Sequence, residues 1–260
     1  MILADTHVHL HDLFDPGVWL DAALTHFDAR VATFPDDRPP RLLLCLTDPA
    51  GQASDRKLVE EIRDTGAWHL SWGTGSLHVE AERKDGRRIA ILPGRQIVSR
   101  EGLEVLALNC RLTVPDRQHT ASALIDLVLE SDGLPVLPWS FGKWLGRRGR
   151  VVEALLEQRT NFLLADNGNR WPERPLPKLL RRGEGQGIPV LAGSDPLPFR
   201  GQEVRVGSCG IVAEDAWPDL PAEAVFSRTI AARAWSRFQG RMPLFRFAQS
   251  MVRMQIRKRR

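Results

Sequence analysis

The stretch "ADTHVHLHD", residues 4–12, places three histidines at alternate positions close to the start of the chain. Side chains alternate along a strand with a period of two, so one face of this strand is predicted to carry Asp5, His7, His9 and His11. Apolar residues 2–4 lead into it, as in a buried strand. A surface strand with solvated imidazoles is the plain alternative. The apolar entry favours a strand whose imidazoles converge on a metal ion.

Beyond this strand, apolar runs and helical patterns alternate along the chain. A helical pattern covers residues 18–31, and "RLLLCLTD" (41–48) is typical of a strand buried on both faces. Residues 67–110 form a hairpin region, and the alternation then resumes, which predicts an α/β fold with a parallel sheet or barrel. The later strands are predicted to end at Trp139, Asp166 and Asp195. In a parallel barrel these ends share one mouth with the histidines.

Short motifs stand at the strand ends in a fixed order. They are "DTHVHLHD", "CLTDPAG", "ILPGRQIV", "VLPWS", "DNGNR" and "AGSDPLP". As an ordered series they resemble the PHP family, the polymerase and histidinol phosphatase superfamily of metal-dependent phosphoesterases. The resemblance implies a distorted seven-stranded (β/α) TIM-like barrel, here with hairpin insertions. It also implies a site with up to three metal ions.

Several expected ligands of that family are replaced in this chain. Pro49 and Leu197 stand where histidines are expected, Gln96 replaces a bridging glutamate, and "LPW" (137–139) replaces the Ala-His-Pro motif. A neutral amide cannot offset the repulsion between two dications. A trinuclear site is therefore disfavoured, and the expected cofactor is one divalent transition metal (Zn, Mn or Fe) or none.

The surviving ligand set belongs to one metal position of the family, and it consists of His7, His9 and Asp195. Two imidazoles and one carboxylate suffice for a single ion with open positions. Gln96 is a candidate catalytic residue that could orient a bound water. Asp166 is a candidate general base or extra ligand, and capping of its own turn is an equal alternative.

The segment "WSFGKWLGRRGR", residues 139–150, gathers cations, glycines and tryptophans after a strand end. It is the candidate loop for an anionic, phosphorylated substrate. The residues assigned to substrate binding are Trp139, Lys143, Trp144, Arg147 and Arg148. The alternative is a basic helix start with core tryptophans.

Length and composition set the remaining expectations. The 260 residues, with 43% hydrophobic and 26% charged residues, predict one soluble domain over 1–260. No apolar run is long enough for a membrane span, and three unpaired cysteines favour a reducing cytoplasm. Ten cations and no acidic residue follow Glu223, so residues 224–260 are predicted to be a basic helical extension. Nucleic-acid binding by this tail is the less favoured alternative.

Two functions from different classes compete. The first is a metal-dependent hydrolase of a phosphoester, with one ion at the barrel mouth activating a water molecule. The second is a non-catalytic barrel that binds an anionic metabolite or a protein partner, and the loss of several ligands supports it. A carbon–nitrogen amidohydrolase would need histidines on later strands, whereas the last histidine of this chain is His119.

Overall fold

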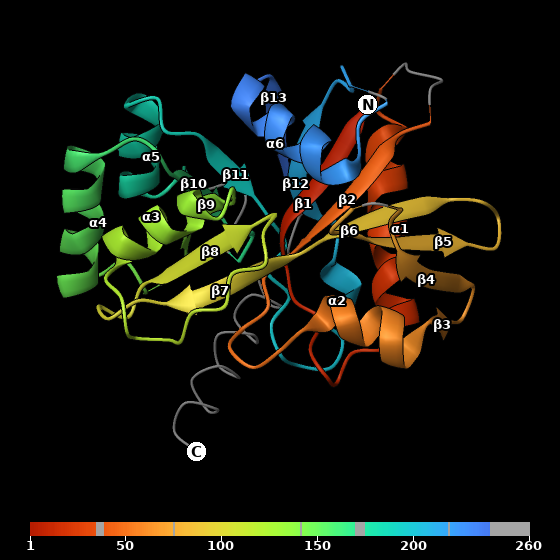
Figure 1. Ribbon diagram of the computed structural model, residues 1–260. Helices are drawn as coiled ribbons and strands as arrows, with labels where there is room; N and C mark the ends of the chain where they lie inside the picture. Colours follow the sequence, from red (N-terminus) through yellow and green to blue (C-terminus); the bar gives the residue numbers. More distant parts are fainter. Residues whose placement is uncertain (35–38, 75, 141, 170–174, 218, 240–260) are drawn as a thin grey trace.

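The computed structural model describes residues 1–34, 39–74, 76–140, 142–169, 175–217 and 219–239. Their strands form two mixed sheets that lie side by side (Figure 1). The larger sheet runs in the order β13 (Trp235–Gln239), β12 (Cys209–Ala213), β1 (Ile2–Val8), β2 (Arg41–Leu46), β6 (Arg88–Leu92), β5 (Val79–Arg83), β4 (Trp68–Trp72) and β3 (Asp64–Thr65). The smaller sheet runs in the order β11 (Val190–Ala192), β10 (Leu163–Asp166), β9 (Leu134–Trp139), β8 (Glu104–Leu108) and β7 (Gly94–Val98).

Most helices lie on the outer faces of the sheets, and the last one packs into the buried cluster that both sheets share. The helices are α1 (Pro16–Val31), α2 (Ser54–Arg56), which continues as a π-helical turn over Lys57–Ile62, α3 (Ala121–Glu130), α4 (Arg147–Gln158), α5 (Lys178–Gly185), a 3₁₀ turn over Glu203–Arg205, and α6 (Ala222–Ala232). Figure 1 shows α3, α4 and α5 together beside the smaller sheet. None of the helices in the described part of the chain combines the length and apolar character that a membrane span requires.

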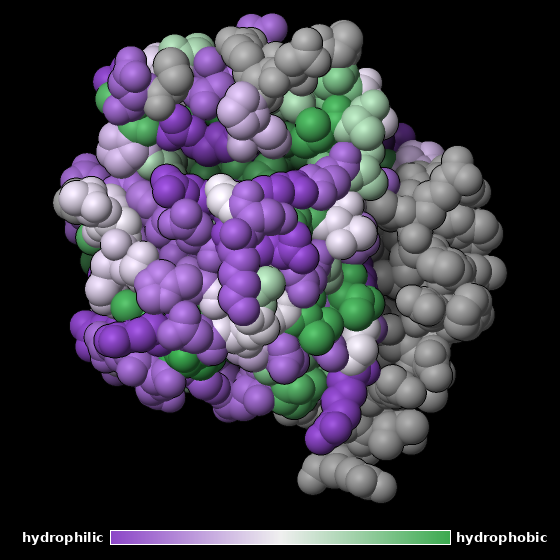
Figure 2. Space-filling view, turned by 90° about the vertical axis from the view of Figure 1, so that its right-hand side faces the viewer, coloured by the Kyte–Doolittle hydropathy of each residue, from purple (hydrophilic) through white to green (hydrophobic). Residues whose placement is uncertain are grey.

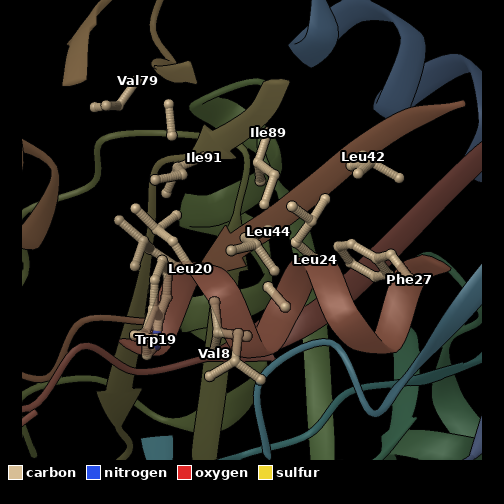
Figure 3. Packing of buried hydrophobic residues seen from close by; sticks show 14 of the residues in the cluster. Val8, Trp19, Leu20, Leu24, Phe27, Leu42, Leu44, Val79, Ile89 and Ile91 are labelled. Atoms are coloured by element: carbon tan, nitrogen blue, oxygen red, sulfur yellow. The ribbon is translucent and has the colours of Figure 1, made fainter. Parts of the chain in front are cut away.

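Helix α1 packs against the larger sheet. The Asp15 carboxylate caps its start by accepting a hydrogen bond from the Val18 amide, and Pro16 supplies a pre-set backbone angle for the first turn. Apolar residues at helical spacing then face the sheet, as Figure 3 shows for Trp19, Leu20, Leu24 and Phe27. Helix α1 therefore covers the face of the larger sheet that is turned away from the smaller sheet.

Alternation along the strands separates three buried clusters. On β2, Leu42, Leu44 and Leu46 belong to the cluster under α1, whereas Leu43 and Cys45 belong to a cluster shared with the smaller sheet. A third cluster lies between the smaller sheet and its helices α3, α4 and α5. The middle cluster therefore lies between the two sheets. Side chains at the edge of this cluster can come together from both sheets.

The predicted seven-stranded (β/α) TIM-like barrel is wrong. The two sheets contain eight and five strands, and no strand ladder of the described residues closes them into a barrel. Strand β12 pairs antiparallel with β1 on the edge where a barrel would place its last parallel strand. The hairpin strands β3, β4 and β5 are not peripheral insertions, because they extend the larger sheet. The alternation of apolar runs and helical patterns in the sequence predicts parallel strand pairs. It does not reveal which strand lies at the edge of a sheet.

The segment predicted as a helical extension contains more than helix. Residues up to Ala232 form the end of α6, and β13 (Trp235–Gln239) then joins the edge of the larger sheet beside β12. The highly basic residues 240–260 lie outside the described part of the chain. On the face shown in Figure 2, which includes the hairpin strands, hydrophilic residues predominate, consistent with ion pairs such as Arg83–Asp85 and Arg88–Glu82.

Candidate metal centre

Strand β1 carries His7, and His9 follows directly after its end, so both histidines reach the space between the sheets. The register of β1 against β2 shifts between Asp5 and Val8, so the strict alternation expected for residues 5–11 is broken at that point. His7 and His9 are both buried, at 1% and 6% exposure. The Thr47 hydroxyl, which donates to the Val8 carbonyl, lies 3.5 Å from His9 Nδ1. Thr47 thus places an oxygen that can accept from the His9 Nδ1 proton.

Asp195 approaches from the loop after β11. Its amide donates to the His7 carbonyl at 2.8 Å, which ties this loop to the end of β1. Its φ of +41° lies in the left-handed region that non-glycine residues rarely adopt. Gly193 makes the approach possible, because a Cβ on it would lie 2.4 Å from the Cβ of His7. The loop is thus held in a demanding conformation that carries the carboxylate to the histidines.

The three candidate ligand atoms form a compact triangle. His7 Nε2 and His9 Nε2 are 3.2 Å apart, and they lie 3.6 and 3.5 Å from Asp195 Oδ1. Zinc bonds of about 2.0–2.1 Å in a tetrahedral site place neighbouring ligands about 3.3–3.4 Å apart. The triangle therefore has the size of one face of a metal's coordination shell. Among the His, Cys, Asp and Glu side chains of the described residues, this triangle is the group close enough together to hold an ion.

The second oxygen of Asp195 is occupied by protein donors. The Asn167 and Asn169 amides donate to Asp195 Oδ2 at 2.7 and 3.1 Å, and the Asn169 amide also donates to the Asp195 carbonyl at 3.0 Å. Arg205 in turn donates to Asn169 Oδ1 at 2.5 Å and to the Gly168 carbonyl at 3.3 Å. Only Oδ1 is turned toward the histidines, so the site offers a carboxylate ligand through one oxygen.

Burial and charge set the protonation of this group. Burial lowers the pKa of His7 to about 4, although the Asp195 carboxylate opposes that shift. Burial raises the pKa of Asp195, but the two histidines and Lys143 outweigh it and hold that pKa well below its usual range. Near neutral pH, His7 has a free lone pair and Asp195 is ionised. These are the forms in which both residues bind metals.

Asp5 supports the backbone around the site. Its Oδ1 accepts from the Ser194 amide at 2.9 Å and the His7 amide at 3.3 Å, and its Oδ2 accepts from the Gly207 amide at 2.8 Å. Burial, which these hydrogen bonds oppose, raises the pKa of Asp5 to about 7. Asp5 is therefore not the acceptor of the His7 ring proton, and His7 Nδ1 is buried with no hydrogen-bond partner among the described residues.

Two further predicted residues lie close to the triangle. Gln96, on β7, lies close enough to His7 for its side-chain amide to raise the pKa of the imidazole. Lys143 lies near enough for its charge to act on both His7 and Asp195, and its ammonium pairs with Glu104. His11 is turned to another contact, since its Nε2 lies 3.1 Å from the Pro196 carbonyl oxygen.

Asp166 takes a different position from Asn167. Along β10, Leu163 and Ala165 belong to the middle cluster and Leu164 to the cluster under the helices, so alternation turns Asp166 away from the middle space. Its Oδ1 accepts from the Gly168 amide at 3.4 Å. The residue of this turn that reaches Asp195 is Asn167. The geometry thus favours turn capping for Asp166, and its role as a base stays a prediction.

The loop of residues 139–150 divides between the core and the surface, with residue 141 outside the described part of the chain. Trp144 is buried in the cluster under α3, α4 and α5, and Trp139 packs against that cluster. Arg147 is exposed, and Arg148 donates to the Gly142 carbonyl at 3.2 Å. Of the five residues assigned to substrate binding, Lys143 is the one whose charge lowers the pKa of both His7 and Asp195.

Three residues hold Asp195 in place, a role that the sequence did not predict for any of them. Asn167 and Asn169 occur in "DNGNR", a motif from which only Asp166 was selected, and Arg205 lies ten residues after Asp195. Amides at alternate positions after a strand end are the signal that could have identified the first two. Nothing in the sequence pattern indicates the contact between Arg205 and Asn169, because it depends on how two loops meet.

Comparisons with known proteins show the fold. No family model and no curated protein matches the chain. The crystal structure of PsfC from Pseudomonas syringae PB-5123 is similar, with a TM-score of 0.53, 15% identity and coverage of 99% of this chain and 97% of that chain. Endonuclease Q, solved with a 27-mer duplex substrate carrying an abasic lesion, has a TM-score of 0.45 and 12% identity over 91% of this chain and 57% of that chain. The protein therefore shares its overall fold with PsfC.

Proposed function

We propose that the protein is a metal-dependent hydrolase of a phosphoester that uses one divalent transition metal, Zn²⁺, Mn²⁺ or Fe²⁺. The observation that carries the proposal is the triangle of His7 Nε2, His9 Nε2 and Asp195 Oδ1, with edges of 3.2, 3.6 and 3.5 Å. The likeness to PsfC supports the fold and leaves the activity to be argued from this site. Membership of the PHP family, suggested by the ordered motifs, is part of the same proposal.

The ligand set favours a single ion. Asp195 Oδ2 is held by Asn167 and Asn169, so the carboxylate cannot bridge to a second ion without losing those hydrogen bonds. Gln96 brings no negative charge to the space beside His7, and two dications there would repel each other strongly. When bound, one ion would lower the pKa of a water molecule and polarise a phosphoryl oxygen.

The chain supplies the surroundings for that chemistry. The neutral Gln96 amide beside His7 can orient a water molecule by hydrogen bonding, which is the positioning role proposed for it. The Lys143 ammonium attracts the anionic substrate, with the exposed Arg147 and the neighbouring Arg148 providing a more distant cationic rim. Trp139 is proposed to contact the substrate with the part of its ring that the core packing leaves accessible, whereas Trp144 is buried in that packing and is proposed only to support the loop.

The test measures hydrolysis of a phosphomonoester and a phosphodiester with each of the three metals added. The proposal predicts turnover that depends on one metal equivalent and falls at least about a hundredfold in His9→Ala. His69→Ala is the matched control, because His69 is exposed and pairs with Asp64 on the hairpin. Asp166→Asn tests the predicted base separately, and the capping geometry predicts a small effect on turnover.

A protein that binds one metal ion and hydrolyses neither ester would contradict the hydrolase proposal. That result would favour the alternative, a protein that binds an anionic metabolite or a partner without turnover. Lys143→Ala distinguishes the substrate role within the hydrolase proposal, since it should raise KM more than it lowers kcat. Arg150→Ala, which changes an exposed cation of α4, is its control.

A further inference from the structure

A second pocket lies on the opposite side of β7 from the metal ligands. Asp48 and Arg95 form a parallel bridge, so their side chains share one face. Their neighbours Thr47 and Gln96 turn to the other face, where Thr47 lies beside His9 and Gln96 beside His7. The backbone that carries Asp48 and Arg95 therefore separates this pocket from the metal centre.

The pocket has the size of a small-molecule site. Its volume is about 320 Å³, and its wall comes from the end of β2, the loop before α2, the start of β7 and the segment after β8. Sites for small molecules begin at about 300 Å³ and combine an apolar lining with a few polar groups. Here Leu46, Pro93 and Leu112 supply apolar wall. An inorganic ion alone would leave most of this volume empty. An organic group attached to the ion would fill the rest.

Three guanidinium groups line the pocket from separate segments of the chain. Arg56 belongs to α2, Arg95 to β7 and Arg111 to the segment after β8. Arg111 is held in place, since it pairs with Asp55 at 2.8 Å and lies over the Trp72 ring at 4.8 Å. Arg95 is fixed by donating to the Gln52 carbonyl at 2.6 Å. Cations fixed in advance bind an anion with little loss of side-chain entropy.

The two carboxylates in the wall already have protein donors. Asp48 accepts from the Ser54 amide at 2.7 Å and from the Ser54 hydroxyl at 2.6 Å. Asp55 accepts from Arg111 and from the Arg56 amide. An ammonium ligand would have to compete for these oxygens. The pocket thus contains three guanidinium groups and two carboxylates whose oxygens already accept hydrogen bonds. These carboxylates do not form a cation site.

Two buried polar atoms in the wall lack a protein partner among the described residues. They are Arg95 Nε, a donor, and Gln52 Oε1, an acceptor. Buried polar atoms are nearly always hydrogen-bonded, so each of these can take a partner from outside the protein, either a water molecule or an oxygen of a bound ligand. An anionic oxygen suits Arg95 Nε, and a hydroxyl group suits Gln52 Oε1. Both groups occur together in a phosphorylated alcohol or sugar.

We propose that this pocket is a second binding site, separate from the metal centre, for the phosphate group of a small hydroxylated molecule. Guanidinium groups reaching the pocket from three segments suit the several oxygens of a tetrahedral phosphate, which accept from more directions than a planar carboxylate does. The apolar wall takes the carbon skeleton. Binding at this site needs no metal ion.

The experiment titrates inorganic phosphate and glycerol 3-phosphate into the full chain after metal removal with a chelator, followed by calorimetry. We expect both to bind, glycerol 3-phosphate more tightly, and acetate at the same ionic strength to bind at least about tenfold more weakly than phosphate. Arg95→Gln should weaken phosphate binding by at least about tenfold, because it removes a charge-assisted donor. Arg100→Gln is the matched control, since Arg100 lies beyond the end of β7, is exposed and does not line the pocket.

Arg56→Gln is a second variant that avoids a folding defect, because Arg56 is exposed. It should also weaken phosphate binding while leaving the melting temperature unchanged. Absence of phosphate binding to the metal-free wild type would overturn the proposal. So would equal affinity of the wild type and both pocket variants. Loss of binding in Lys143→Ala with retention in Arg95→Gln would assign the anion to the metal centre and would likewise overturn it.

Discussion

Asn167 is the residue whose replacement tests how the carboxylate ligand is held. The Asn167 amide donates to Asp195 Oδ2 at 2.7 Å, and Asn169 donates to the same oxygen at 3.1 Å. Hydrogen bonds to a charged group contribute about 1.5–3 kcal/mol. Removing partners of this kind lowers metal affinity by about 10–100-fold, which is a free energy of the same size. Because Asn169 remains in Asn167→Ala, we expect about a tenfold loss, and about a hundredfold loss in the double variant with Asn169→Ala.

The assay is competition for zinc against a chromophoric chelator near neutral pH, where His7 is neutral. Asn161→Ala is the matched control, because Asn161 is exposed and its side chain accepts a hydrogen bond from Arg159, away from Asp195. Its zinc affinity should equal that of the wild type. An Asn167→Ala protein that binds zinc as tightly as the wild type would refute the reasoning that Asp195 depends on these amides for its orientation.

Two further predictions concern stability. Gly193→Ala would place a Cβ 2.4 Å from the Cβ of His7, so it should lower the free energy of unfolding by about 1–3 kcal/mol and weaken metal binding. Gly185→Ala is the control, because its Cβ would meet no atom within 4 Å. Equal denaturation midpoints of the two variants would contradict this prediction. For His78, hydrogen bonds and charge from Glu80 and Glu223 outweigh burial and raise the pKa above 6.5. Its stabilising contribution is therefore full below pH 6.5 and is lost as the pH rises through the raised pKa. Melting curves of His78→Gln should lack this pH dependence, and an unchanged profile would contradict the assignment.

The sequence predicted which candidate ligands come together better than it predicted the architecture. Alternate histidines after an apolar run predict that His7 and His9 can reach one point, and the late strand end predicts that Asp195 joins them. The structure contains that triangle. The barrel was wrong because pairing of β12 with β1 depends on long-range contacts that no local pattern records. Asn167 and Arg205 were missed for the same reason, since their role exists only where separate loops meet.

The expected alternation on the first strand shows a second limit. A period of two places Asp5 and His7 on one face, yet the register against β2 shifts between Asp5 and Val8, and the Asp5 carboxylate accepts from the backbone amides of Ser194 and Gly207. A bulge of this kind has no glycine or proline to announce it in the sequence.

Metal stoichiometry tests the central claim most directly. The purified full chain is saturated with zinc or manganese, freed of excess metal, and analysed for metal and protein content, beside the variants His9→Ala and Asp195→Ala. The account predicts about one ion per chain in the wild type, and loss of that ion in both variants. Two or three ions in the wild type, or one ion retained in both variants, would contradict a single centre built from His7, His9 and Asp195.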